Sequence, residues 1–104
     1  MVQKGQILQF IKENESLFRN RYHIVKLGLF GSYSRNEQSE LSDIDLIIEF
    51  EPQTENIFRI KNEVRELFRQ KFNLSVDICR EKYIKPIFRK QILHEATYAY
   101  QAKR

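Results

Sequence analysis

Residues Gly31–Asp45 read GSYSRNEQSELSDID and join two apolar runs, IVKLGLF at 24–30 and IDLIIEF at 44–50. Near-continuous apolar runs of this length are typical of buried strands. The first strand therefore ends at a Gly-Ser turn, and the second strand contains a pair of aspartates, Asp43 and Asp45, at its beginning. The turn and the aspartate pair are the candidate functional segment.

The flanking segments show helical periodicity. Regularly spaced apolar residues predict one helix over about 3–18 and another over about 55–71. Residues 74–79 predict a third strand, and a last helix is expected from Ile87 to about Tyr98, after Pro86. This order indicates a small α/β (α+β) domain with a three- to four-stranded mixed sheet. We expect helices on one face of the sheet, an open carboxylate face, and a single domain over residues 1–104.

Composition restricts the class of protein. A chain of 104 residues that is 41% hydrophobic is sufficient for one packed core. It has no apolar stretch long enough to cross a bilayer and no signal-peptide core at its start, so we expect a cytoplasmic protein without membrane contact. The single cysteine, Cys79, excludes an internal disulfide and fits a reducing compartment. Without a His/Cys cluster, we expect no structural zinc site.

The net charge of +4 has two interpretations. It is either ordinary charge spread over helical faces or a source of attraction to nucleotides, RNA or an acidic protein partner. The basic residues are scattered, with no run of five or more, so we expect no direct binding of nucleic acid.

Strand alternation predicts that three carboxylates converge. Residues i and i+2 share a face of a strand, so Asp43 and Asp45 lie opposite the apolar face of the second strand. The same argument places Asp77 on the corresponding face of the third strand. Carboxylates this close repel each other unless cations lie between them, and Mg²⁺ prefers such hard oxygen ligands. We therefore predict two Mg²⁺ ions held by Asp43 and Asp45, with Asp77 completing one site or helping to deprotonate an acceptor hydroxyl.

The Gly-Ser turn supplies a candidate phosphate site. Gly31 permits a sharp turn and a close approach of the backbone to a ligand. Ser32 begins a short helix expected near residues 33–37, where free backbone N–H groups bind anions and the hydroxyl can donate to a β- or γ-phosphate oxygen. Arg35, about one turn later, either pairs with phosphate or forms a structural ion pair.

The combined pattern resembles that of a known superfamily. Gly31-Ser32, then Asp43-x-Asp45, then Asp77 in a later strand resembles the DNA polymerase β-type nucleotidyltransferases, and the chain length resembles their minimal nucleotidyltransferase (MNT) members. The resemblance covers roughly residues 5–100. It implies a polymerase β-like core in which Ser32 contacts the triphosphate of ATP and the three aspartates bind Mg²⁺.

The turn departs from the family pattern at two positions. Arg35 matches the arginine of the family's Gly-Ser-x-Ala-Arg-Gly stretch, but Ser34 and Asn36 replace its Ala and its second Gly. Asn tolerates a left-handed backbone better than most residues, so Asn36 is compatible with the turn. Tyr33 occupies a position that is often basic in the family.

The resemblance also implies a function. MNT proteins of this kind often act as antitoxins encoded beside a HEPN-domain RNase toxin, and they silence it by transferring AMP from ATP to a toxin tyrosine, in a type VII-like system. Larger members add a helical domain that holds the acceptor. The present sequence contains no such segment, so we expect a protein acceptor docked over an exposed carboxylate face.

Three functions are compatible with the sequence. The chain is either an enzyme of this kind or a non-catalytic binding module that inhibits its toxin sterically, and transfer to a small molecule is a third possibility. Tyr98 and Tyr100 are candidate self-modification residues, although packing against the last helix is the more ordinary role for a tyrosine there.

Overall fold

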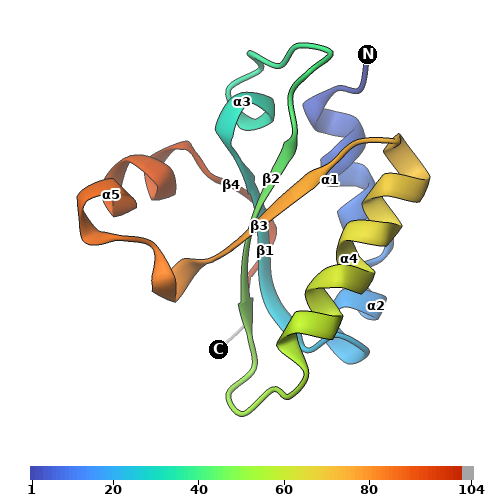
Figure 1. Cartoon of the computed structure of the whole chain (residues 1–104), viewed down its shortest axis with the longest axis vertical. Helices are drawn as coiled ribbons and strands as arrows, with labels where there is room; N and C mark the ends of the chain where they lie inside the picture. Colours follow the sequence, from blue (N-terminus) through green and yellow to red (C-terminus); the bar gives the residue numbers. More distant parts are fainter. Residues whose placement is uncertain (102–104) are drawn as a thin grey trace.

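The computed structural model describes residues 1–101, and a four-stranded sheet runs through its centre (Figure 1). The strand order is β3-β2-β1-β4. Strand β1 is antiparallel to both β2 and β4, and β2 is parallel to β3. In chain order the elements are α1 (Lys4–Glu13), α2 (Glu15–Asn20), β1 (Ile24–Phe30), α3 (Gly31–Ser34), β2 (Ile44–Phe50), α4 (Ile57–Phe72), β3 (Val76–Arg80), the 3-10 turn η1 (Glu81–Tyr83), α5 (Pro86–Glu95) and β4 (Thr97–Tyr100).

The main core lies between one face of the sheet and helices α1, α2 and α4 (Figure 1). Ile44, Leu46 and Ile48 of β2 are fully buried in it, as the alternation in the sequence predicts. Phe18 of α2 stacks on Phe68 of α4 with ring centroids 6.2 Å apart. The two central strands therefore have the bounds expected from their apolar runs, and β2 presents its core face as expected.

The first and last expected helices are corrected by the structure. The helix expected over 3–18 is two helices, because Asn14 leaves helical geometry and its side-chain amide donates to the Phe10 carbonyl at 2.9 Å. The last helix ends at Glu95, and Tyr98 and Tyr100 belong to an edge strand, β4, that pairs with β1. Four residues are too few for a periodicity to distinguish helix from strand, so pairing with β1 settles the conformation.

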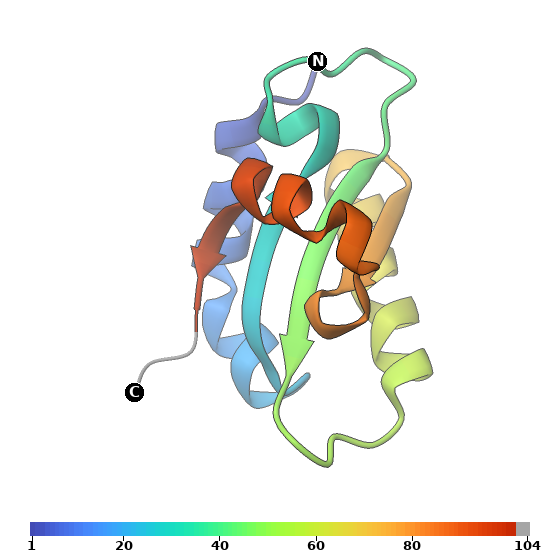
Figure 2. The ribbon, with the colours of Figure 1, turned by 90° about the vertical axis from the view of Figure 1, so that its left-hand side faces the viewer.

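The opposite face of the sheet is partly covered rather than fully open. Turn η1 and helix α5 cross it, on the side away from α1, α2 and α4 (Figures 1 and 2). Glu49 of β2 points to this side, and its carboxylate accepts a hydrogen bond from the Lys82 backbone N–H at 3.4 Å. Ile47 on the same face is fully buried, although it lies outside the main core cluster. Within residues 1–101, no helix has the length and apolar character needed to span a membrane.

Candidate active site

Strand register brings two of the predicted site residues opposite each other. In the parallel pair of β2 and β3, Asp45 lies directly across from Asp77, and neighbouring strands are about 4.8 Å apart. In the antiparallel pair of β1 and β2, Asp45 lies across from Phe30, the last residue before the Gly-Ser turn. Asp43, Asp45 and Asp77 are the only aspartates in the sequence, and all three lie at this end of the sheet.

Gly31 lies directly against the Asp45 side chain. Its φ of +73° is in the left-handed region, which L side chains rarely adopt. A Cβ at this position would overlap Oδ2 of Asp45 and would approach its Cγ to 3.1 Å. Both the backbone conformation and the available space therefore require glycine here.

The environment of Asp45 disfavours its charge. Burial, reinforced by the negative charges of Asp77 and Asp43, raises its pKa from 3.8 to about 6, while Arg35 acts in the opposite direction. Asp43 and Asp77 are exposed, and Asp45 is half-buried. Like charges on three neighbouring carboxylates are relieved when a cation is bound among them, so this electrostatic arrangement suits a cation site.

The donor set fits Mg²⁺, but the side chains do not form a complete cage. Among residues 1–101, no three His, Cys, Asp or Glu side chains are grouped closely enough to hold a metal ion by themselves. Mg²⁺ bound with a nucleotide commonly takes only one or two carboxylates, together with phosphate oxygens and water. Asp43, Asp45 and Asp77 supply carboxylates of that kind at one end of the sheet, so the chemistry of the residues agrees with a site that a nucleotide would complete.

The turn itself begins earlier than the sequence suggested. Helix α3 starts at Gly31 rather than near residue 33, and the Ser32 carbonyl accepts a hydrogen bond from the Glu37 N–H at 2.9 Å. Ser32 is half-buried beside Gly31, and amides in the first turn of a helix lack intrahelical acceptors. Asn36 has a φ of +59°, which confirms that it takes the left-handed conformation.

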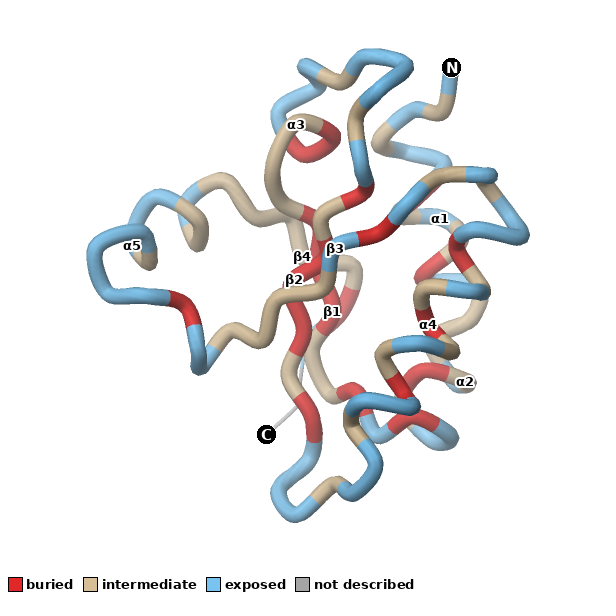
Figure 3. The backbone as a smooth tube through the Cα atoms, viewed as in Figure 1, coloured by how far each residue is buried: buried red, intermediate tan, exposed pale blue. Residues whose placement is uncertain are grey.

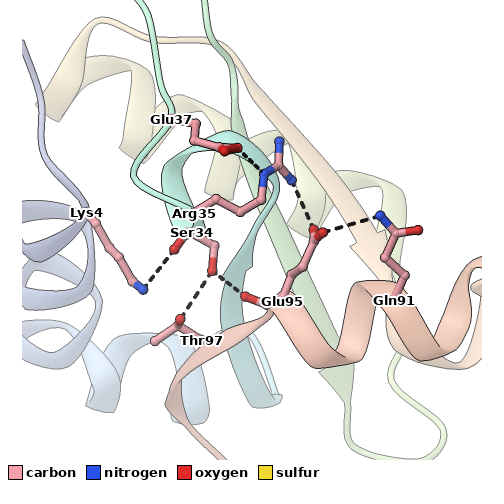
Figure 4. Close-up of polar contacts among 7 residues, drawn as sticks. All are labelled: Lys4, Ser34, Arg35, Glu37, Gln91, Glu95 and Thr97. Atoms are coloured by element: carbon pink, nitrogen blue, oxygen red, sulfur yellow. Dashed lines mark hydrogen bonds and ion pairs between the residues drawn. The ribbon is translucent and has the colours of Figure 1, made fainter.

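Arg35 forms ion pairs with two glutamates. Its Nε donates to Glu37 at 2.8 Å and its Nη1 donates to Glu95 of α5 at 3.0 Å (Figure 4). These two hydrogen bonds raise the pKa of Arg35. Of the two roles expected for Arg35, the ion pair is therefore present in this structure. Glu95 was not identified from the sequence, because its partner is 60 residues away along the chain.

Ser34 anchors the turn to the end of α5. Its buried Oγ donates to the Glu95 carbonyl at 2.5 Å and lies 3.2 Å from Oγ1 of Thr97, while its own carbonyl accepts from Lys4 at 2.9 Å (Figure 4). The only signal in the sequence was the replacement of the family's Ala by Ser. The hydroxyl thus contributes to positioning the turn that carries Ser32.

A spacious surface hollow lies away from this site. It has a volume of about 860 Å³ and is bounded by His23, by the loop 51–56 and by the start of α4. These segments are at the end of β1 and β2 opposite Gly31 and Asp45. We assign it no part in the chemistry, because it contains none of the three aspartates.

Comparison with known proteins agrees with this geometry. The family described as Polymerase beta, Nucleotidyltransferase matches residues 12–104. MJ1379 of Methanocaldococcus jannaschii, provisionally named a protein adenylyltransferase, is 31% identical over 95 residues, which cover 90% of this chain and 95% of that protein. The protein adenylyltransferase MntA of Thermococcus cleftensis is 29% identical over 98 residues, which cover 94% of this chain and 97% of MntA.

Solved structures share the fold. A provisionally named minimal nucleotidyltransferase superposes with a TM-score of 0.72 at 27% identity, covering 92% of this chain and 95% of its own. A toxin-antitoxin structure with AMP-PNP gives a TM-score of 0.65 at 19% identity over 98% of this chain and 76% of that one. A tri-AMPylated Shewanella oneidensis HEPN toxin in complex with its MNT antitoxin gives 0.56 at 20% identity over 90% and 73%. Because the family model spans nearly the whole sequence, this chain belongs to the polymerase beta nucleotidyltransferase family.

Proposed function

We propose that this chain is a Mg²⁺-dependent protein adenylyltransferase that transfers AMP from ATP to a tyrosine hydroxyl of a partner HEPN toxin, and so acts as its antitoxin. Relatives that match over nearly their whole length are named for protein adenylylation, and a structural neighbour is an MNT antitoxin bound to an AMPylated HEPN toxin. The reaction belongs in the cytoplasm, where ATP and Mg²⁺ are available.

The observation that carries this proposal is the register of Asp45 against Asp77 beside the Gly31–Ser32 turn. It places candidate metal-binding carboxylates next to a candidate phosphate-binding turn, on elements fixed by the sheet. A steric inhibitor would need neither the burial and the repulsion that raise the pKa of Asp45 nor the glycine that fits against it. Sites built for chemistry commonly retain such unfavourable electrostatics.

The reaction is an in-line displacement at the α-phosphorus of ATP. The acceptor hydroxyl oxygen forms a bond to that phosphorus, the bond to the oxygen bridging the α- and β-phosphates breaks, and pyrophosphate leaves. Asp77, exposed at the edge of the site, accepts the hydroxyl proton. Ser32 donates a hydrogen bond to a β- or γ-phosphate oxygen. Asp43 and Asp45 would hold two Mg²⁺ ions, and Asp77 would complete one of the two sites. Bound Mg²⁺ would neutralise charge on the phosphates.

Intact-mass spectrometry tests this function. The purified chain is mixed with ATP, Mg²⁺ and the HEPN-domain protein encoded beside it, and we expect one or more AMP units on the partner. The Asp43→Asn/Asp45→Asn variant should transfer none, whereas Glu51→Gln, an exposed carboxylate at the other end of the sheet, should transfer normally.

Other outcomes distinguish the alternatives. A stable complex without added mass, together with equal neutralisation of the toxin by wild type and by the double Asn variant, would establish a steric binding module instead. Efficient transfer by the chain alone to a free small molecule, such as an aminoglycoside, would establish a nucleotidyltransferase that acts on small molecules.

A further inference from the structure

Helix α5 exposes apolar side chains that the fold does not use. None of its ten residues is buried, and Ile87 and Phe88 in its first turn are 82% and 53% exposed. Tyr83 in the preceding turn η1 is 68% exposed. The longer helix α4, in contrast, buries Ile60, Val64 and Phe68 in the core. A helix of ten residues is marginal in water without packing, so α5 has an unused capacity to bury surface.

The exposed charge around these side chains is positive. Lys82, Lys85 and Lys90 are all exposed, and none of them forms an ion pair within residues 1–101. The two acidic residues of this segment are already engaged, Glu81 by Lys26 at 2.8 Å and Glu95 by Arg35. We call the exposed set the α5 patch, and it consists of Lys82, Tyr83, Lys85, Ile87, Phe88 and Lys90.

The α5 patch is on the carboxylate side of the sheet and is held in place at both ends. At its start, the carboxylate of Glu81 accepts hydrogen bonds from Lys26 of β1 and, at 3.0 Å, from Tyr98 of β4. At its end, Glu95 is bonded to the turn residues Ser34 and Arg35. Figure 2 shows α5 crossing this face just below the turn, and Figure 3 shows how much of it is exposed. A protein seated on α5 would therefore lie on the same side of the sheet as the aspartates.

We infer that the α5 patch is the docking surface for the acceptor protein, and that it binds a partner surface combining apolar side chains with carboxylates. This inference rests on the proposed function, because it assigns a place to that reaction's acceptor. The basic rim favours an acidic partner and disfavours a second copy of this chain, whose net charge is also positive. Ile87, the most exposed of the apolar side chains in the patch, cannot stack on a base, so the patch suits a protein better than RNA.

Direct binding measurements test the patch. The HEPN-domain protein encoded beside this chain is titrated without ATP against wild type, against Ile87→Ser/Phe88→Ser, and against Lys85→Glu/Lys90→Glu. We expect each pair of substitutions to weaken binding by about tenfold or more. The matched control is Phe58→Ser on α4, which removes an aromatic ring that is 78% exposed on the other side of the sheet and should leave binding unchanged.

The outcomes separate this inference from the proposed function. Binding of both patch variants within twofold of wild type would overturn the inference even if AMP transfer proceeds. Wild-type binding that depends on the patch, without any AMP transfer, would support the inference and contradict the proposed function. The inference would also be overturned if the patch variants kept their binding to the partner but lost binding to mixed-sequence RNA. The same holds if they kept partner binding but lost a concentration-dependent dimer that wild type forms. No binding of wild type to this partner would contradict both.

Discussion

The α-carbon of Gly31 faces the carboxylate of Asp45 so closely that no side chain fits between them. The first residue of the candidate phosphate-binding turn is therefore packed against a candidate metal ligand, although the two residues lie on different elements. This contact ties the position of the turn to that of the carboxylate, so a change at one should disturb the other.

Replacing Gly31 by Ala should damage both stability and activity. The new methyl group would overlap Oδ2 of Asp45 and would force alanine into a left-handed backbone, so we expect a loss of about 1–2 kcal/mol in the free energy of unfolding, together with loss of AMP transfer. Chemical denaturation and intact-mass spectrometry measure the two effects. The control is Gly5→Ala in α1, where the added Cβ meets nothing within 4 Å and stability should be unchanged or raised. Equal behaviour of the two variants would refute this explanation.

Replacing Asp45 by Asn should stabilise the metal-free chain at neutral pH. Because the pKa of Asp45 is raised from 3.8 to about 6 in the folded state, its ionisation above pH 6 costs folding free energy, whereas below 3.8 the group is protonated in both states. We expect a gain of about 1 kcal/mol at pH 7.5, allowing for solvent screening of a half-buried group. The gain should shrink as the pH falls through 6 and vanish below about 3.8.

Denaturation in EDTA across pH 3.5–8 measures this difference. Glu51→Gln should show no comparable gain in stability. This carboxylate is exposed, and the ion pair that the structure describes for it is with His23 rather than with another acidic side chain. A lower stability for Asp45→Asn than for wild type at pH 7.5 would show that the surroundings stabilise the charged carboxylate, and it would contradict this prediction.

Ser34→Ala should lower stability by about 1 kcal/mol, because the Glu95 carbonyl would lose its 2.5 Å hydrogen bond from the buried hydroxyl. Transfer of AMP should persist, since alanine is the residue that the family pattern has at this position. Ser16→Ala, on the exposed surface of α2, is the control. Hydrogen exchange at 93–97 should increase in Ser34→Ala alone, and unaltered exchange there would count against an anchoring role.

Arg35 and Glu95 should respond oppositely in ATP kinetics if Arg35 contacts the triphosphate. Arg35→Ala would remove a cation and raise KM for ATP several-fold, whereas Glu95→Gln would release Arg35 from its 3.0 Å ion pair and leave KM unchanged or lower. Steady-state kinetics at fixed acceptor concentration distinguish the two. Equal rises in KM for both variants would assign Arg35 a structural role only.

Tyr98 and Tyr100 should not be self-modified. The Tyr98 hydroxyl donates to Glu81 at 3.0 Å, and the buried Tyr100 hydroxyl donates to the Ile24 carbonyl at 2.9 Å. Burial raises the pKa of both phenols, which makes their hydroxyls harder to deprotonate. Peptide mapping after incubation with ATP and Mg²⁺ should find neither residue carrying AMP, and any self-modification should instead fall on the exposed Tyr83.

The central strands and the aspartate spacing were predictable from the sequence. Two apolar runs flanking a Gly-Ser turn gave the bounds of β1 and β2, and alternation along β2 separated the core face from the face of Asp45. These features depend only on a residue and its near neighbours in the chain, so they can be predicted from the sequence pattern.

The local sequence pattern therefore specifies the two central strands, the turn between them and the residue types available for chemistry. Four features come from the assembled fold instead: Asp77 lies opposite Asp45, residues 97–100 form an edge strand, Glu95 pairs with Arg35, and α5 crosses the carboxylate face. Each of these depends on the register or packing of segments far apart in the chain. Such contacts are selected by the free energy of the whole assembled sheet, which no local periodicity encodes.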